Sequence, residues 1–427
     1  MSTRKSSSLP QGWAASNLES VVTFFTGGTP FLKSEYVPTG TPVLTKGDVK
    51  PFGRIEHSGR FVDTGHAIAE RYRFTQPGDL LVTTRDLTTA ADFLGLVAPV
   101  PADRKYLINQ GANVFRLNGD LVDARYFVYW ASGIEYRNYI KSAVSGSTQV
   151  HIRKADWLNA PLHLPPKAEQ QRIACVLGAL DDKIELNRRM NVTLEAMARA
   201  LFQSWFVDFD PVRAKASGES ADSICQRLGL TPELLALFPY SFEDSELGEI
   251  PLGWQPTRLD EVLELAYGKA LKATDRLDGS FPVYGSGGVT GFHNESLIEG
   301  PAIIVGRKGT VGSLYWEDRS SYPIDTVFYV RPKMQLTYCF YLLKTLALEN
   351  MNTDAAVPGL NRNNVYRLLV SMPSEQVRAA FERFAKSVRS QICANTKELK
   401  TLSDVRDTLL PKLLSGELVV SMQEGSS

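Results

Sequence analysis

The chain has 427 residues, 43% of them hydrophobic and 22% charged, so it is long enough for two or more domains with packed cores. Lysine plus arginine and aspartate plus glutamate both total 47, and this neutral balance counts against a nucleic-acid binder that works alone through bulk positive charge. No stretch reaches the roughly 18 apolar residues of a membrane helix and the N-terminus lacks an apolar signal-peptide core, so we expect a cytoplasmic protein without membrane contact.

The cysteines and histidines do not suggest a metal site. Cys175, Cys225, Cys339 and Cys393 are scattered, without a CxxC pair, and the five histidines are dispersed. Free buried thiols are therefore expected, and neither zinc ligation nor disulfides are.

The first 165 residues read as a globular α+β region. Short strand-like runs such as residues 78–83 alternate with turns, and residues 124–142 have a helical pattern. We expect a twisted mixed sheet or a partial barrel.

A long helix is predicted from Lys167 to about Phe206. This stretch has no proline and one glycine, and its apolar residues recur at coiled-coil spacing. Forty residues at about 1.5 Å each would make a rod on the order of 60 Å long, which a globular core rarely needs. The rod therefore requires a partner rod.

The remainder of the chain repeats this plan. Residues 207–248 begin like a linker, notably at 214–222, and 232–238 could form a short helix. Strand-like runs at 302–305 and 326–330 and a helical stretch at 336–347 then form a second α+β region. A second apolar seam follows, and the last residues, from 419, read as a tail.

Two sequence offsets relate the halves. Residues 10–13 (PQGW) match residues 251–254 (PLGW) at an offset of 241, and residues 152–165 match 360–373 at an offset of 208. The second offset superimposes the two helical seams without a further gap. The chain therefore contains an internal repeat, arranged as globule, rod, globule, rod, and its second copy is 33 residues shorter inside.

We expect the two rods to pair with each other as antiparallel helices. An asparagine occupies the same step in both seams, where it would fix the register at some cost in stability. Asn187 facing Asn395 is the predicted polar pair, and an exposed, kinked rod centre is the alternative. The predicted pairing residues are Leu180, Ile184, Asn187, Leu194, Val388, Ile392, Asn395 and Leu402.

Motifs for catalysis are missing from the sequence. We find no Walker phosphate loop, no GxSxG, no amino-methylating signature and no zinc-deaminase pattern. Two globules held apart by rods could instead read two separated patches of a long ligand such as DNA, whose helical turn is about 34 Å.

Polar loops with glycine beside basic residues are the candidates for DNA contact, because side chains there can reach base edges and backbone amides can approach phosphates. Each loop alone could equally be a solvated turn. Arg307-Lys308 is the best individual candidate, since it follows a buried-looking strand and precedes a glycine. The predicted set is Lys46, Thr84, Arg85, Ser147, Thr148, Gln149, Arg153, Lys154, Lys269, Lys272, Arg307, Lys308, Thr310, Asn361 and Arg362.

The chain resembles the specificity subunit of type I restriction–modification systems. The resemblance rests on residues 26–30 (TGGTP) and 40–49 (GTPVLTKGDV) in the first globule, and on residues 164–173, 202–211 (FQSWFVDFDP) and 408–418 (TLLPKLLSGEL) at the ends of the rods. It covers nearly the whole chain.

The resemblance implies two target recognition domains, at residues 1–165 and 250–373, and two spacer helices, at 166–212 and 374–418, with a linker at 213–249 and a tail at 419–427. Each domain would read one half of a bipartite, asymmetric site in double-stranded DNA. Two methyltransferase subunits and two restriction–translocase subunits would be partners. S-adenosylmethionine, ATP and magnesium would bind to those partners, so this chain would be non-catalytic and hold no cofactor.

Three other interpretations remain open at this level. The chain could serve a methylation-only or other multi-subunit defence system, because a nuclease partner lies on another chain. It could be a coiled-coil scaffold whose globules bind proteins. It could also be a self-contained enzyme with an unfamiliar site.

Overall fold

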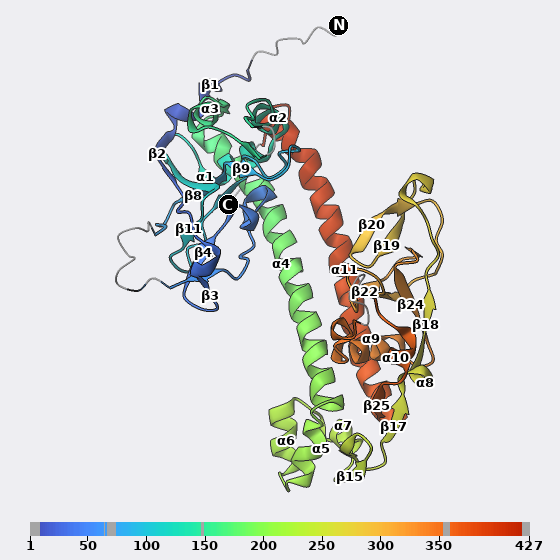
Figure 1. Ribbon diagram of the computed structural model, residues 1–427. Helices are drawn as coiled ribbons and strands as arrows, with labels where there is room; N and C mark the ends of the chain where they lie inside the picture. The colour runs from blue at the N-terminus through green and yellow to red at the C-terminus, as the bar shows by residue number, and fades with distance from the viewer. Residues whose placement is uncertain (1–8, 64, 66–73, 147–148, 353–358, 421–427) are drawn as a thin grey trace, which may run out of the picture. The chain divides into compact units, whose positions relative to one another are not determined.

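The computed structural model describes residues 9–63, 65, 74–146, 149–352 and 359–420 (Figure 1). These residues form two compact units. The first consists of the residues up to Leu186 together with those from Leu399 onward, and the second runs from Asn187 to Glu398. Each unit combines an α+β globule with parts of the two long helices, α4 (Lys167–Phe206) and α11 (Glu375–Leu414). Among the described residues, no helix is long and apolar enough to cross a membrane.

In the first unit, two four-stranded sheets form the globule. One has the antiparallel order β10-β8-β12-β2, and the other has the order β11-β4-β7-β3 with β4 and β11 parallel. Their strands are β2 (Val22–Gly27), β8 (Leu80–Thr83), β10 (Val97–Pro99), β12 (Ala112–Leu117), β3 (Tyr36–Val37), β4 (Thr41–Leu44), β7 (Phe61–Val62) and β11 (Leu107–Ile108).

Shorter elements complete this globule. Three antiparallel ribbons are β1 (Ala14–Asn17) with β14 (Pro161–Leu164), β5 (Val49–Lys50) with β6 (Arg54–Ile55), and β9 (Arg85–Asp86) with β13 (Val150–His151). The predicted helical stretch at 124–142 is two helices, α1 (Ala124–Ser132) and α2 (Ile134–Ser142), separated at Gly133. A short helix, α3 (Lys154–Leu158), carries Trp157 into the core, where its ring is fully buried.

The second unit has corresponding sheets. They have the orders β18-β24-β21-β22 and β20-β19-β23, with β19 and β23 parallel. Their strands are β18 (Leu263–Tyr267), β21 (Ala302–Gly306), β22 (Leu314–Glu317), β24 (Val327–Pro332), β19 (Phe281–Gly285), β20 (Gly288–His293) and β23 (Tyr322–Pro323). The remaining elements are β15 (Phe242–Ser245), β16 (Gly248–Pro251), β17 (Gln255–Arg258), β25 (Leu369–Met372), α8 (Leu259–Val262), α9 (Leu336–Thr345) and α10 (Arg362–Tyr366).

Strand register confirms the internal repeat. Ala14 pairs with Leu164 in the first unit and Gln255 pairs with Met372 in the second, so both sequence offsets, 241 and 208, hold within one ribbon. The repeated turn before this ribbon has the same backbone conformation, because Gly12 and Gly253 have φ values of 85° and 79°. A glycine suits both turns, since other residues adopt positive φ at a cost.

The first long helix has the predicted bounds, Lys167 to Phe206, and the second, Glu375 to Leu414, lies within the predicted segment 374–418. The start of α4 buries Ile173 and Leu177 in the core of the first unit, and α11 buries Phe381 and Val388 in the core of the second. Their antiparallel pairing is visible inside the second unit, where Asn187 and Asn191 of α4 contact residues of α11 in descending order.

The predicted contact between Asn187 and Asn395 is wrong by one helical turn. Asn395 Nδ2 donates to Asn191 Oδ1 at 2.8 Å, whereas Asn187 Nδ2 donates to Glu398 Oε2 at 2.8 Å. Residues four apart share a helix face, so a seam pattern leaves the register of two helices undetermined by one turn. The two buried asparagines nevertheless lie in one polar layer between the helices.

Much of the predicted linker is folded. It contains α5 (Asp210–Ala216), α6 (Ala221–Leu228) and α7 (Pro232–Ala236), and the last of these is the predicted short helix. Val212, Ile224 and Leu235 are buried in the core of the second unit. Ser220 and Thr231 cap α6 and α7 through their side-chain oxygens, and these caps were the signal that the linker interpretation overlooked.

The four cysteines are free, as predicted, but they are not all buried. Cys339 is buried, Cys225 and Cys393 are partly buried, and Cys175 is exposed on α4.

Candidate nucleic-acid interface

In the first unit, two predicted basic residues converge on Gly111. Lys46 lies in a short 3-10 turn after β4, and Arg85 begins β9 directly after β8. A Cβ atom at Gly111 would lie 3.5 Å from Lys46 Cδ and 3.6 Å from Arg85 Cβ, so both side chains lie close to the glycine. Gly111 has a φ of 101°, a backbone conformation that glycine adopts readily and that lets the chain turn there.

Gln110 joins this group, and the sequence prediction missed it. Its side-chain oxygen, in the amide orientation that satisfies both groups, accepts from Nη1 and Nη2 of Arg85 at 3.0 Å each. Glutamine and arginine are side chains that read base edges, and here they stand together. A glutamine directly before a turn glycine was the available signal.

Buried carboxylates hold the two loops in place. Asp48, 1% exposed, accepts from Thr45 N at 2.6 Å and Ser58 N at 2.7 Å, which fixes the turn that carries Lys46. Asp86 accepts from Phe93 N at 2.9 Å and Thr88 N at 3.1 Å. Burial alone would raise the pKa of Asp86, but these hydrogen bonds lower it overall. Asp86 therefore stays ionised and orders the loop beside Arg85.

The other predicted residues of the first unit vary in accessibility. Thr84 is only 8% exposed because it is buried between strands, so it is no longer a candidate for DNA contact. Gln149 is exposed, while Ser147 and Thr148 lie outside the described residues. Arg153 is exposed and forms a bidentate pair with Asp156, with nitrogen–oxygen distances of 2.6 and 3.0 Å.

In the second unit, two predicted arginines gather around an exposed tyrosine. The Arg307 and Arg362 guanidinium carbons lie 5.3 and 4.9 Å from the ring centroid of Tyr267, which is 52% exposed at the end of β18. Arg307 Nε also donates to the Asp325 carbonyl at 3.1 Å. The sequence prediction missed Tyr267, although an aromatic residue just before Gly268 is visible in the sequence.

The remaining candidates of the second unit lie within a few residues of this group in the sequence. Lys308, Thr310, Lys269 and Lys272 are exposed. Lys308 forms a single antiparallel β-bridge with Gly359. Lys269 is separated from Tyr267 only by Gly268. Asn361 is instead the N-cap of α10, where its side chain accepts from Asn363 N at 2.9 Å.

The two groups occupy corresponding places in the repeat. Arg85 follows the end of β8, and Arg307 follows the end of β21, which is the strand at the same place in the matching sheet order. In addition, the first residue of α3 and that of α10 are both basic and both lie against a ring: Lys154 Nζ is 5.1 Å from the centroid of Phe25 on β2, and Arg362 lies against Tyr267 on β18. Cations placed beside aromatic faces suit binding of a phosphate backbone and unstacked bases.

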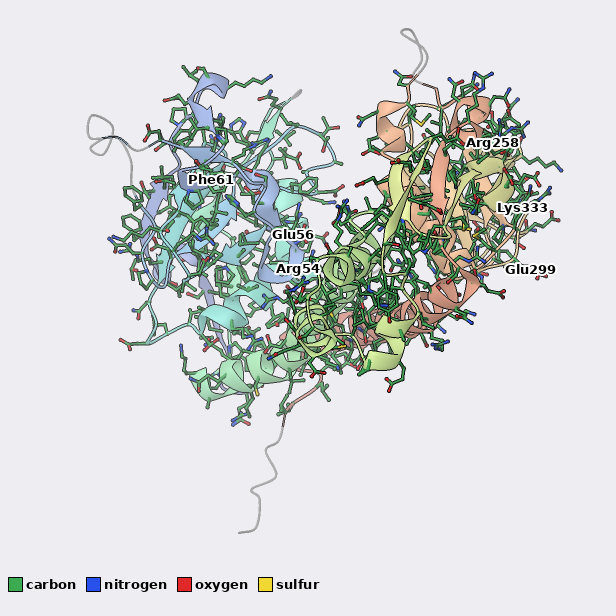
Figure 2. The ribbon with its side chains drawn as sticks, turned by 90° about the horizontal axis from the view of Figure 1, so that it is seen from below. Arg54, Glu56, Phe61, Arg258, Glu299 and Lys333 are labelled. Carbon is green, nitrogen blue, oxygen red and sulfur yellow. The ribbon has the colours of Figure 1, made fainter. Side chains whose placement is uncertain are left out.

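Basic residues elsewhere are often occupied by carboxylates. Arg258 and Lys333 lie near each other on the second unit (Figure 2), where Arg258 pairs with the Asp260 carboxylate at 3.0 Å and Lys333 donates to the Asp260 carbonyl. In the first unit Arg54 pairs with Glu56 at 2.9 Å (Figure 2). Within the described ranges, no group of three histidine, cysteine, aspartate or glutamate residues could hold a metal ion.

Most of the chain matches a single known protein family, in two segments. Residues 10–196 and 251–384 match the family described as the type I restriction modification DNA specificity domain. The two matched segments contain the two globules, each with the start of its long helix.

Individual relatives agree with that match. The chain is 28% identical over 343 residues to the HindI type I restriction enzyme specificity subunit of Haemophilus influenzae, covering 66% of this chain and 74% of the relative. It is 25% identical over 452 aligned positions to the MjaIX specificity subunit of Methanocaldococcus jannaschii, covering 96% and 95%. The crystal structure of a type I restriction–modification S subunit from M. genitalium has a similar fold, with a TM-score of 0.55, 20% identity and 99% coverage of both chains.

Proposed function

The chain belongs to the type I restriction modification DNA specificity domain family, and we propose that it is the DNA-recognition subunit of a type I restriction–modification complex. Each globule reads one half of a bipartite, asymmetric DNA site. The target recognition domains are residues 1–165 and 250–373, and the helices at 166–212 and 374–418 set the spacing between the half-sites.

One observation carries this proposal. Two globules of the same topology each present basic side chains at the same strand end, beside Gln110 in the first and beside Tyr267 in the second. Phosphate contacts position a protein on DNA, and side chains such as Arg, Lys and Gln read base edges. Because the two groups differ in composition, the two half-sites differ in sequence.

Catalysis lies in other subunits under this proposal. Two methyltransferase subunits, which bind S-adenosylmethionine, dock on the helices, and two ATP- and magnesium-dependent restriction subunits complete the complex. The purified chain is therefore expected to transfer no methyl group to DNA by itself. Methyl transfer by the chain alone would contradict the assignment of a non-catalytic role.

Replacing both arginines that face Tyr267 tests the recognition surface. R307A/R362A in the complex with the methyltransferase subunits is expected to weaken binding of specific DNA by roughly 1–3 kcal/mol per lost base contact, and by less where the contact is to phosphate. Fluorescence anisotropy at fixed salt measures this, with the complex assembled to the same stoichiometry as the wild type.

The double variant R258A/K333A is the matched control. It also removes two positive charges from the second unit. Arg307 is hydrogen-bonded to Thr326, just before β24, whereas Lys333 comes just after the other end of this strand, about six residues or 20 Å away. Its affinity should match the wild type. Equal losses in both variants would mean that bulk charge and not this surface binds DNA.

The spacing role has its own test. One heptad inserted at equivalent positions in both helices lengthens each by about 10 Å, or roughly three base pairs of DNA. The methylation site of the complex should then carry a gap longer by about three base pairs, with unchanged half-sites. Sequencing of methylated adenines measures the gap, and an unaltered gap would exclude a spacing function for the helices.

A further inference from the structure

The apolar seams of α4 and α11 do not by themselves determine which helix each one meets. The seams have the same phase at an offset of 208, so Ile184 of α4 corresponds to Ile392 of α11, and Leu194 to Leu402. Asn187 likewise corresponds to Asn395. A second copy of α4 would therefore offer α4 nearly the same apolar surface as α11 does. Something else must select the partner.

In the first unit, a buried ion pair joins the two helices. Arg406 of α11, whose side chain is 8% exposed, donates from Nη1 to Asp181 Oδ1 of α4 at 2.7 Å. Tyr129 of α1 donates its hydroxyl to Asp181 Oδ2 at 2.9 Å. Burial, as the main cause, and the nearby Asp181 carboxylate, as the second, raise the pKa of Tyr129. The Tyr129 hydroxyl therefore stays protonated and remains a hydrogen-bond donor at neutral pH. Phe52 covers the Arg406 guanidinium, with 3.4 Å from carbon to ring centroid.

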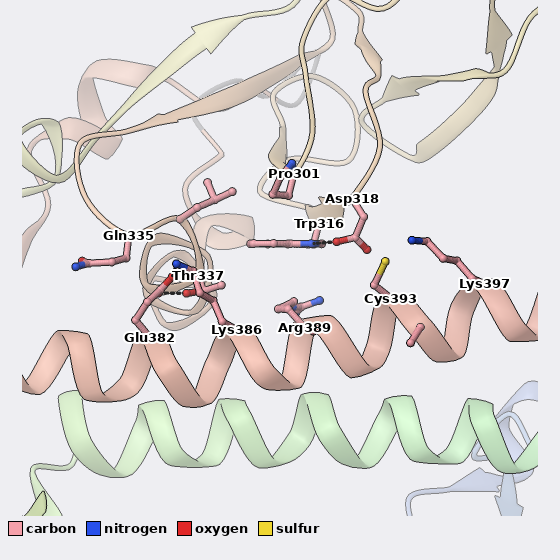
Figure 3. A pocket seen from close by; sticks show the side chains of 13 residues that line it. Pro301, Trp316, Asp318, Gln335, Thr337, Glu382, Lys386, Arg389, Cys393 and Lys397 are labelled. Atoms are coloured by element: carbon pink, nitrogen blue, oxygen red, sulfur yellow. Dashed lines mark hydrogen bonds and ion pairs between the residues drawn. The ribbon is translucent and has the colours of Figure 1, made fainter.

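In the second unit, a similar cluster again places its acid on α4 and its arginine on α11. Arg389 of α11 pairs with Glu195 of α4, and the Tyr341 hydroxyl of α9 donates to Glu195 Oε2 at 3.2 Å. Lys344 of α9 is a second cation on the same carboxylate. Figure 3 shows Arg389 beside the ring of Trp316, where its guanidinium carbon is 4.9 Å from the centroid and the side chain lines a cavity of about 570 Å³.

The two clusters occupy corresponding positions, but the residues that correspond differ in charge. Asp181 and Arg389 are equivalent by the offset of 208, and each contacts the tyrosine of its own globule. One of these residues is an acid and the other a base. As a result both carboxylates that join the two helices, Asp181 and Glu195, lie on α4, whereas both arginines lie on α11. Asp407, which also pairs with Arg406 at 2.8 Å, is its neighbour on α11 and does not join the helices.

We propose that this distribution of charge makes α4 and α11 accept each other and reject a second copy of themselves. In an α4–α4 pair of the same geometry, Glu195 would meet Asp181 of the other copy, twice over, because Asp181 stands where Arg389 does. In an α11–α11 pair, Arg406 would meet Arg389 twice. Like charges brought together in a partly buried seam repel strongly, while the native pairs attract. Folding therefore pairs the two helices within one chain and disfavours exchange of helices between two chains. This inference does not depend on the proposed function.

Exchanging the charges of one cluster tests the proposal in the full chain. In E195R/R389E the ion pair between the two helices is reversed but stays complementary, although Lys344 of α9 then faces the introduced arginine. An α4–α4 pair would now place the introduced arginine against Asp181, and an α11–α11 pair would place the introduced glutamate against Arg406. Homotypic pairing is no longer repelled, and a concentration-dependent dimer is expected after unfolding and refolding, where the wild type returns as a monomer. Light scattering coupled to size-exclusion chromatography measures the mass.

Exchanging both clusters is the decisive control. The variant D181R/E195R/R389E/R406D is complementary within the chain, and its homotypic pairs again join like charges, so it should be monomeric. The equivalent exchange in the first unit, D181R/R406D, should dimerise as E195R/R389E does. It replaces E195R/R389E as the test variant if E195R/R389E does not unfold cooperatively in urea. Monomers from both single-cluster exchanges, or dimers from the wild type or the fourfold variant, would overturn the proposal.

Discussion

The two globules share a framework and differ in the surfaces that it carries. Their four-stranded antiparallel sheets have the same strand order. The two-stranded ribbons β1–β14 and β17–β25 have the same register. The first globule combines Lys46, Arg85 and Gln110, whereas the second packs Arg307 and Arg362 around Tyr267. Hydrogen-bonded strands tolerate few changes of register, while loops at their ends vary freely. This division lets one fold carry two surfaces of different chemistry.

The largest expected difference between the globules is in their cores. Trp157 and Val365 occupy the same repeat position and are both fully buried. Trp157 also donates to the Tyr136 hydroxyl at 2.8 Å and packs against Phe115. W157A should lower the free energy of unfolding of the first unit by about 3–5 kcal/mol. V365A removes two methyl groups and should cost the second unit about 1.5 kcal/mol.

Hydrogen-exchange mass spectrometry of the full chain can measure both effects. Each substitution should speed exchange in its own unit and leave the other protected. Equal losses from W157A and V365A would show that the two cores depend on this position alike, which their side-chain volumes do not predict.

Matched glycines should give the next largest difference. Gly268 is the repeat counterpart of Gly27, but a Cβ atom at Gly268 would lie 2.1 Å from the Ile324 carbonyl oxygen. At Gly27 the nearest atom would be Asn113 Oδ1 at 3.8 Å, an ordinary contact. G268A should therefore destabilise the second unit by roughly 1–3 kcal/mol through overpacking, and G27A should be nearly neutral.

Gly28 supplies a control for that comparison. Its Cβ atom would lie 2.3 Å from the Asn109 carbonyl oxygen, so the crowded position in the first unit is one residue later than in the second. Thermal unfolding should then show a loss for G28A similar to that for G268A. A tolerated G28A would indicate that the backbone near Asn109 can move aside.

The smallest difference concerns the first turns of α3 and α10. Asn361 caps α10 through its side chain, and N361A should cost about 1 kcal/mol. Arg153 holds the same position before α3 but caps nothing, and its ion pair with Asp156 is exposed. R153A should cost less than about 0.5 kcal/mol. Urea unfolding curves would contradict this assignment if R153A were the more damaging change.

Sequence reasoning picked out most members of the two candidate groups individually, but not how they are brought together. Lys46, Arg85, Arg307 and Arg362 were predicted from glycine-adjacent loops and are at least partly accessible. Thr84 was predicted by the same pattern and is buried, because a polar residue just after a strand can still pair with its neighbours. Gln110 and Tyr267 were missed, since their importance comes from strand pairing with distant segments.

The sequence alone determined the repeat, the two long helices and the need for them to pair. These features depend on local periodicity, on turn glycines and on two constant offsets, all of which are visible along the chain. The tertiary structure decided the helix register, the folding of the linker and the arrangement of charges between α4 and α11. Those outcomes depend on contacts between residues up to more than two hundred positions apart, such as Asp181 with Arg406, for which local patterns carry no information.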